Sequence, residues 1–227
     1  MAQVWHDLLF AHQPIAPESL RAHVPAELEL DTYDGSAWIG VVPFRMSGVR
    51  LRGLPAVPGT AAFPELNVRT YVRVGDRPGV WFFSLDAANA PAVAVARAWF
   101  HLPYFRARMS CLARGVEVDY SSERTHADAP AAAWRGTYAP TGPVEPAARG
   151  TLEHWLTERY CLYARSPDGR IRRGEIHHDP WPLQPATARI ELDTMAAAHG
   201  IALPDRAPHL LFARRLDVRI WAPRRVR

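Results

Sequence analysis

Apolar and polar residues alternate with a period of two along much of this chain, and turn residues interrupt the pattern at short intervals. In residues 66–74, LNVRTYVRV, aliphatic side chains fall on one face and Asn67, Arg69 and Tyr71 on the other. This alternation is typical of strands, and the closely spaced turns leave room only for short helices. The sequence therefore predicts a β-dominated α+β fold with a curled or barrel-like sheet and two or three short helices.

Turn and cap residues set the expected boundaries of these elements. Hairpin turns are expected at Asp34-Gly35, at Gly75–Gly79 and at Arg114-Gly115. Pro43 lies inside a predicted strand and indicates an edge or a bulge there, because proline cannot donate a backbone hydrogen bond. A short helical piece is expected over 17–23, and helices over 89–100 with Asn89 as N-cap, 151–158 with Thr151 as N-cap, and 193–199 before Gly200. No β–α–β alternation is evident.

The composition fits one globular domain, and we expect a single domain over residues 1–227. Hydrophobic residues make up 48% of the chain and aromatic residues 10%, which is enough for a sizeable core. The two cysteines, Cys111 and Cys161, are too few for a disulfide framework. No apolar run reaches the roughly 18 residues that a membrane span needs. We therefore expect a cytoplasmic protein with free thiols that does not enter membranes.

Positive charge is concentrated at the C-terminal end. The segment Arg214–Arg227 holds six arginines and one aspartate, whereas the formal net charge of the whole chain is only +4. Alternation in this segment predicts an edge strand followed by a frayed basic tail at about 222–227. A phosphate- or nucleic-acid-binding tail is one interpretation. A solvated basic end is the interpretation that the sequence favours, so nucleic acid is not an expected partner.

All 27 basic residues are arginines, and the chain contains no lysine. This excludes any mechanism that needs a side-chain amine, such as a Schiff base, a pyridoxal phosphate linkage or a P-loop lysine. Glycine-rich nucleotide motifs are absent too, so no cofactor is expected. His177-His178 would point to opposite faces of a strand, so no metal site is expected. Cys161 lies in an apolar segment, where a buried thiol is the expected role.

Two charged residues stand in apolar surroundings and are candidates for a functional site. Glu65 opens the strand that carries Asn67 and Arg69 on the same face. Arg97 lies within AVAVARAWF, in a helix whose face is otherwise suited to burial. One interpretation is a structural ion pair between Glu65 and Arg97 that joins strand to helix. The other is a pocket in which arginine binds an acidic or carbonyl ligand and Glu65 acts as acid or base.

Further clusters mix charged and aromatic side chains in the same way. Glu158 and Arg159 adjoin Tyr160, and His177 lies close to Trp181. The many aromatic residues favour an apolar cavity. These aromatic residues include Trp5, Trp38, Trp81, Phe83, Trp99 and Tyr104.

Five motifs, in order along the chain, carry a resemblance to a known family. They are FPELNVRTYV (63–72), GVWFFSLDA (79–87), AVARAWFHLPY (94–104), LTERYCLY (156–163) and IHHDPWPLQ (176–184). With them, the chain resembles the YqjF-like family of uncharacterised proteins, the domain of unknown function 2071. That family is placed in the acetoacetate decarboxylase-like superfamily. The resemblance implies a mainly antiparallel, cone- or barrel-like β fold with an internal pocket.

The resemblance also assigns roles to individual positions. It places the pocket glutamate of the decarboxylases at Glu65 and the arginine of their helix at Arg97. The two lysines of their active site fall on Tyr104 and Phe105, and their carboxylate-binding arginine falls near Trp5. Neither lysine position holds an amine, so this chain cannot be an acetoacetate decarboxylase that works through an imine.

Two functions follow as expectations. The first is a pocket that binds a small acidic or carbonyl-containing molecule without changing it. The second is a non-covalent enzyme, with lyase- or isomerase-like proton transfer by Glu65 and Tyr104 on a small carbonyl substrate. A homo-oligomer is left open. The residues expected to bind the ligand are Arg69, Arg97, Trp81, Phe83, Glu158, Arg159, His177 and Trp181.

Overall fold

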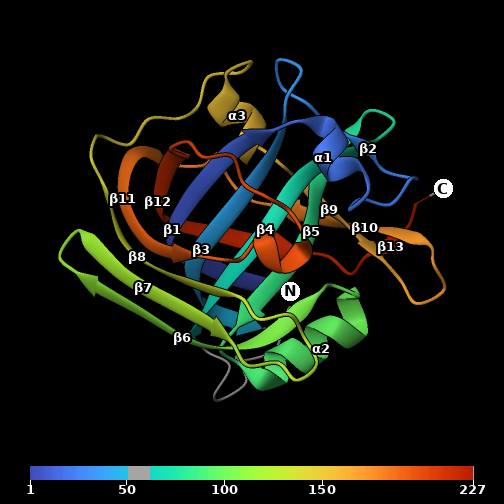
Figure 1. Ribbon diagram of the computed structural model, residues 1–227, viewed down its shortest axis with the longest axis horizontal. Coiled ribbons are helices and arrows are strands. Elements are labelled where there is room, and N and C mark those ends of the chain that lie inside the picture. The colour runs from blue at the N-terminus through green and yellow to red at the C-terminus, as the bar shows by residue number, and fades with distance from the viewer. Residues whose placement is uncertain (51–61, 227) are drawn as a thin grey trace.

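Strands dominate the structure, a computed structural model that describes residues 1–50 and 62–226 (Figure 1). This confirms the predicted sheet-dominated α+β class. The strands are β1 (Ala2–Ile15), β2 (Glu29–Leu30), β3 (Ala37–Arg50), β4 (Ala62–Val74), β5 (Arg77–Ala87), β6 (Tyr104–Arg114), β7 (Glu117–Arg124), β8 (Ala133–Pro140), β9 (Cys161–Arg165), β10 (Ile171–His177), β11 (Leu183–Asp193), β12 (His209–Ile220) and β13 (Arg224–Arg225). The helices are α1 (Pro17–Arg21), α2 (Ala90–Phe100), α3 (Leu152–Thr157) and the short 3-10 helix η1 (Ala197–His199).

Hydrogen-bonded strands form one large curved sheet whose neighbours close two circuits (Figure 1). Both circuits share the strands β12, β1, β3, β4 and β5. The first circuit is completed by β9 and β10, and the second by β6, β7, β8 and β11. Most pairings are antiparallel, but β5 pairs in parallel with both β6 and β9. Helices α2 and α3 lie at opposite ends of the sheet in Figure 1.

Strand β5 pairs with β4 on one edge, and on its other edge it changes partner along its length. Residues 80–81 pair with residues 162–163 of β9, and residues 85–87 pair with residues 104–106 of β6. Between them, residues 82–84 have no strand partner on this edge within the described part of the chain. We call this place the β5 fork. The β5–α2–β6 connection is a β–α–β unit, which the sequence analysis did not anticipate.

Strand β4 has both faces buried. On one face, Leu66 and Val68 join a core cluster with the aromatic side chains of β7 and β8. On the other face, Glu65, Asn67 and Arg69 are buried as well, and their exposed fractions are 3%, 5% and 8%. The predicted alternation is therefore correct, but both of its faces lie inside the protein. Polar side chains on β4 must find their partners inside.

Several local predictions are confirmed. The side chain of Asn89 accepts a hydrogen bond from the Ala92 backbone N–H at 3.0 Å and caps α2. Thr151 caps α3 in the same way. Pro43 lies opposite an irregular stretch of β1, where the register against β3 shifts between His6 and Ala11. In that stretch β1 has one more residue than β3, which makes a bulge. The backbone N–H that Pro43 lacks is therefore not missed from a regular ladder there.

The C-terminal region corrects the prediction of an edge strand and a frayed tail. Strand β12 is central, because it pairs with β1, β10 and β11. Arg224 and Arg225 are not frayed either, since they pair with Arg173 and Arg172 of β10 as strand β13. The alternation of buried Val218 with exposed neighbours suits a central strand as well as an edge. Residue 227 of the predicted tail lies outside the described residues.

Residues 183–199 also differ from the prediction. The expected helix over 193–199 shrinks to η1, and Gly200 follows it with the left-handed φ of 72° that its stop position requires. The preceding segment forms β11, which the sequence analysis missed. Within residues 1–50 and 62–226, no helix has the length and apolar character needed to cross a membrane.

A buried ion pair joins β5 to β7. The Arg124 guanidinium donates to both carboxylate oxygens of Asp86, at 2.7 and 2.9 Å. Their side chains are 1% and 0% exposed, and the Phe105 ring lies 4.2 Å from the guanidinium carbon. Because a bidentate pair fixes the position of both side chains, this contact fastens β7 of the second circuit to β5 next to the β5 fork.

We expect Asp86→Asn to destabilise the protein by about 3–5 kcal/mol, because Arg124 would keep its charge in a buried site without a counter-charge. Urea unfolding measures this loss. The matched control is Glu123→Gln, which breaks the exposed Arg108–Glu123 pair, with side chains 75% and 59% exposed. That change should cost less than about 1 kcal/mol. Equal losses for the two variants would contradict a structural role of the buried pair.

Candidate functional site

The two residues predicted to be catalytic lie in direct contact. Glu65 is on β4, and Tyr104 is the first residue of β6. The Tyr104 hydroxyl donates a hydrogen bond to Oε2 of Glu65 at 2.8 Å. The two strands come together because both flank β5, where Ala87 is paired with Glu65 on one edge and Arg106 on the other. Neither the carboxyl group of Glu65 nor the phenol has an ion-pair partner among the described residues.

Burial decides the protonation of this pair. The pKa of Glu65 is raised to about 8, mainly by burial; the hydrogen bond from Tyr104 lowers it and the nearby Asp86 charge adds to the rise. Burial and the neighbouring Glu65 carboxyl raise the pKa of Tyr104 well above its ordinary value. At neutral pH, Glu65 is therefore mostly a neutral carboxylic acid and Tyr104 a neutral phenol. The carboxyl group of Glu65 and the phenol of Tyr104 therefore each carry a proton that can be donated to a hydrogen-bond acceptor.

Tyr104 lines a mostly apolar cavity of about 320 Å³ beside α2, which we call the α2 cavity. Val95 and Trp99 of α2 belong to its wall and are 51% and 63% exposed. Among its other lining residues are Met46, Phe63, Phe100 and Ile220. A cavity of this composition suits an apolar molecule with one polar group near Tyr104.

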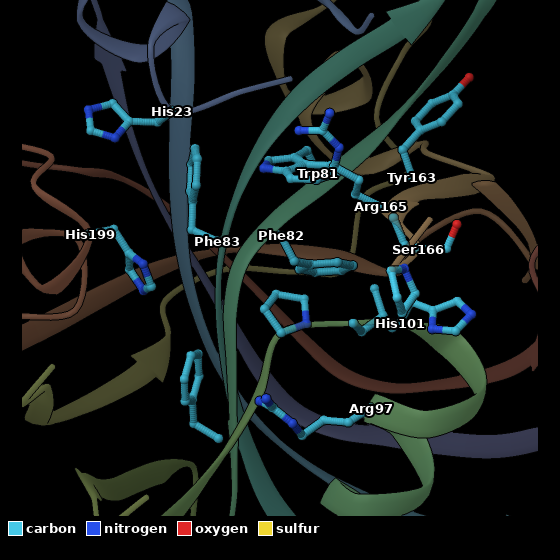
Figure 2. A pocket seen from close by; sticks show the side chains of 15 residues that line it. His23, Trp81, Phe82, Phe83, Arg97, His101, Tyr163, Arg165, Ser166 and His199 are labelled. Carbon is cyan, nitrogen blue, oxygen red and sulfur yellow. The ribbon is translucent and has the colours of Figure 1, made fainter. Parts of the chain in front are cut away.

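A second, larger cavity of about 640 Å³ opens at the β5 fork, and we call it the fork cavity (Figure 2). Three of the predicted ligand-binding residues line it: Trp81, Phe83 and Arg97. Leu102 lines both this cavity and the α2 cavity, so the two adjoin at the connection from α2 to β6. The predicted residues are therefore divided between two cavities.

Arg97 does not occupy the buried position expected from the sequence. It is exposed, and its Nη1 donates to the backbone oxygen of Tyr104 at 2.7 Å. The expected ion pair with Glu65 is therefore wrong, because Glu65 is bonded to Tyr104 instead. Val93 is the only fully buried residue of α2, and Arg97, one turn later on the same face, already meets solvent.

Arg69 and Arg159 belong to neither cavity, and both lie near the ring of Tyr71. Their guanidinium carbons are 5.9 and 4.9 Å from its centroid. Arg159 pairs with Asp31 at 2.5 Å, whereas Arg69 has no carboxylate within 4 Å among the described residues. Instead, the guanidinium of Arg69 lies 5.1 Å from the Phe10 ring. Four residues along β4 separate Arg69 from Glu65, or about 13 Å between their backbones.

The other predicted binding residues lie elsewhere. Glu158 accepts a hydrogen bond from the backbone N–H of Trp181 at 3.0 Å, and Trp181 stacks on Trp5 at 5.7 Å. These contacts are those of packed structural residues. His177 is exposed and lines a separate cleft of about 990 Å³ together with Arg224. The structure thus brings together Glu65 with Tyr104, and Trp81 with Phe83 and Arg97, but not the whole predicted set.

Some residues at the fork cavity were not found from the sequence. They include His101, Arg165 and His199. His101 follows α2 with a φ of 53°, and its position before Leu102-Pro103, where the helix stops, was the only signal available. Among residues 1–50 and 62–226, no group of three or more His, Cys, Asp or Glu side chains is placed to hold a metal ion. Cys161 is buried, as predicted.

Comparison with known proteins places this geometry in a family. The family of uncharacterized conserved proteins DUF2071 matches residues 2–217. The uncharacterized protein YqjF of Bacillus subtilis (strain 168) is 47% identical over 225 residues, which cover 99% of this chain and 92% of YqjF.

Solved structures show a similar fold at low sequence identity. Acetoacetate decarboxylase from Legionella pneumophila superposes with a TM-score of 0.68 at 13% identity, over 100% of this chain and 88% of the decarboxylase. The enduracididine biosynthesis enzyme MppR, complexed with the condensation product of pyruvate and imidazole 4-carboxaldehyde, has a TM-score of 0.68 at 11% identity, over 99% and 88% of the two chains. The fold is therefore that of the acetoacetate decarboxylase-like proteins.

We expect Glu65→Gln to change how stability depends on pH. A carboxyl whose pKa rises to about 8 on folding stabilises the fold fully below its unfolded pKa, and this contribution is lost as the pH rises toward 8. From about pH 5 to about pH 8, the free energy of unfolding of the unchanged protein should therefore fall by about 1.4 kcal/mol per pH unit relative to Glu65→Gln. Urea titrations across this range measure the difference.

Tyr104→Phe provides the matched control for this titration. The hydrogen bond from Tyr104 lowers the pKa of Glu65, so its removal should extend the loss of stability to higher pH. Parallel pH curves for the unchanged protein and Glu65→Gln would contradict a neutral Glu65 in the folded protein.

Proposed function

We propose a function for the α2 cavity, starting from the fact that the chain belongs to the DUF2071 family of uncharacterized conserved proteins. The protein binds a small, mostly apolar molecule whose carbonyl oxygen accepts a hydrogen bond from Tyr104. One observation carries this proposal: the phenol lines an apolar cavity and is bonded on its other side to a buried carboxyl group. Such a mostly apolar cavity, in which Gln3, Arg50 and Tyr104 are the described polar lining residues, suits a small apolar ligand with one carbonyl.

The protonation of Glu65 controls what Tyr104 can donate. In the structure the Tyr104 hydroxyl donates to Glu65, but a neutral Glu65 can reverse this bond and donate its own O–H to the Tyr104 oxygen. The phenol hydrogen is then free for a ligand in the cavity. An ionised Glu65 is only an acceptor and draws the phenol hydrogen to itself across the 2.8 Å contact. Because the pKa of Glu65 is about 8, the carboxyl keeps its proton at neutral pH, and the arrangement in which Glu65 donates is open to it there.

The absence of lysine supports a non-covalent site. A carbonyl ligand meets no side-chain amine in this chain, so no side chain can hold it as an imine, and hydrogen bonding with apolar contact is the proposed mode of binding. The ligand class has support from MppR, whose structures include one complexed with pyruvate. Pyruvate carries a carbonyl and a carboxylate. In this chain, the neutral Glu65–Tyr104 pair offers a carbonyl a hydrogen bond but gives a carboxylate no counter-charge.

Proton transfer is the second candidate function. A proton can move from Glu65 through Tyr104 to the carbonyl oxygen while water removes a hydrogen from the neighbouring carbon, whose bonding electrons form the enol double bond. Glu65 then recovers a proton from solvent, and the reverse steps return the ketone. The pKa of about 8 favours this candidate, because a general acid works best when its pKa lies near the working pH.

Further properties stay predictions. They are the single domain over residues 1–227, the cytoplasmic location and an assembly of identical chains. The same holds for the absence of nucleic acid among the partners.

Cyclohexanone is a suitable probe for the carbonyl site, with methylcyclohexane as the matched ligand that lacks the oxygen. NMR titration should show tighter binding of the ketone near pH 6 than near pH 9, because ionised Glu65 withdraws the donor. Tyr104→Phe should weaken ketone binding about fivefold at pH 6 through the loss of one hydrogen bond. Glu65→Gln should remove the pH dependence.

The controls separate binding from catalysis. Methylcyclohexane should bind equally to the unchanged protein and to Tyr104→Phe. Equal ketone affinities for these two proteins would contradict the proposed carbonyl contact. Incubation in deuterium oxide tests the second candidate: faster deuterium uptake beside the carbonyl with the unchanged protein than with Glu65→Gln supports proton transfer, and equal rates leave binding alone.

A further inference from the structure

The fork cavity arises from the way β5 exchanges partners. Residues 82–84 lie between the short parallel ladders to β9 and β6, and there the two neighbouring strands diverge. The hollow between them is lined by residues from both sides of the fork. In Figure 2, Phe82 lies in the middle, with Trp81 and Arg165 on one side and Arg97 and His101 on the other.

Aromatic side chains dominate the apolar part of this lining. Trp81, Phe82 and Phe83 follow one another along β5, and the β-bulge at Phe83 interrupts their pairing with β4. Phe105 and Tyr163 add rings from β6 and β9. Rings from three strands around one hollow favour a ligand with a planar aromatic body.

The charged part of the lining has a single sign. None of the described residues that line the cavity is an aspartate or glutamate, whereas Arg97 and Arg165 both belong to it. Three histidines, His23, His101 and His199, complete its polar groups. A lining with cations and no carboxylate creates a positive potential, which attracts an anionic ligand.

The two arginines differ in how far their charge is already compensated. Arg165 lies 3.6 Å from the Glu27 carboxylate and donates through Nε to the backbone oxygen of Gly169. Arg97 has no carboxylate within 4 Å among the described residues. Its backbone contact with Tyr104 holds the guanidinium in place, 5.9 Å from the Phe105 ring. Arg97 is therefore the cation that is positioned and still uncompensated.

Two histidines add observations that point to a ligand. The Nε2 atom of His199 is buried and has no hydrogen-bond partner among the described residues. Burial, with the charges of Arg124 and His23, lowers the pKa of His199 to about 4, so the ring is neutral. His101 adopts a left-handed φ of 53° directly after α2, a conformation that costs energy for a residue with a side chain.

We propose that the fork cavity binds a small aromatic acid as its carboxylate, with the ring among Trp81, Phe82 and Phe105 and the carboxylate on Arg97. This site is separate from the carbonyl site at Tyr104, and its ligand class is different. An arginine guanidinium presents two parallel N–H groups to a carboxylate, which an amide of the same shape cannot match in charge. The aromatic walls supply the apolar contact that a small anion alone would lack.

Phenylacetate and phenylacetamide form a matched pair of probes for this site. Isothermal titration should show that phenylacetate binds at least about tenfold more tightly than the amide, and that added salt weakens only the anion. Arg97→Gln should reduce phenylacetate affinity about tenfold and leave the amide unchanged, and Arg97→Lys should restore part of the loss. NMR of the Trp81 indole locates the ligand.

The control variants lie inside and outside the cavity. Arg165→Gln should change the affinity less than threefold, because Glu27 already compensates that charge, and the distant, exposed Arg114→Gln should have no effect. Tyr104→Phe should leave phenylacetate binding unchanged, so the outcome is independent of the carbonyl site. Equal affinities for phenylacetate and phenylacetamide, absence of binding, or equal losses for Arg97→Gln and Arg165→Gln would each overturn the proposal.

Discussion

The burial of both faces of β4 is the constraint on which the rest of the structure depends. This strand belongs to both circuits, so its polar residues cannot turn to solvent on either side. Each one must find a partner inside or lose its charge. Glu65 loses its charge and shares a hydrogen with Tyr104, whereas Arg69, which cannot lose its proton, lies against aromatic rings. The chemistry of the interior is thus a consequence of topology.

The same topology explains why the fork cavity and the α2 cavity lie next to each other. A strand that pairs first with β9 and then with β6 forces its neighbours apart, and the connection through α2 must cross the gap. The two cavities adjoin at this connection, with Leu102 in both walls. Tyr104 of the neutral Glu65–Tyr104 pair lines one of them, and Arg97 and Arg165 line the other. The two cavities therefore suit two different ligand classes, as proposed above.

Local features were predictable from the sequence because their causes are local. The cap of α2 at Asn89 and the alternation of β4 depend on residues a few positions apart. The pairing of Glu65 with Tyr104 came from the family resemblance, since residues 39 positions apart meet only through β5. Burial of Arg97 was predicted wrongly because an apolar helix sequence does not reveal how little of α2 the sheet covers. Strand β12 has the alternation of an edge but is central.

The first circuit is closed by its two shortest ladders. Only two residue pairs join β5 to β9, and two join β10 to β12, whereas β1 and β12 pair over ten. Few backbone hydrogen bonds therefore fasten the β9–β10 hairpin to β5 and β12, and residues 161–164 of β9 are all buried. The closure of this circuit rests on side-chain burial more than on backbone pairing.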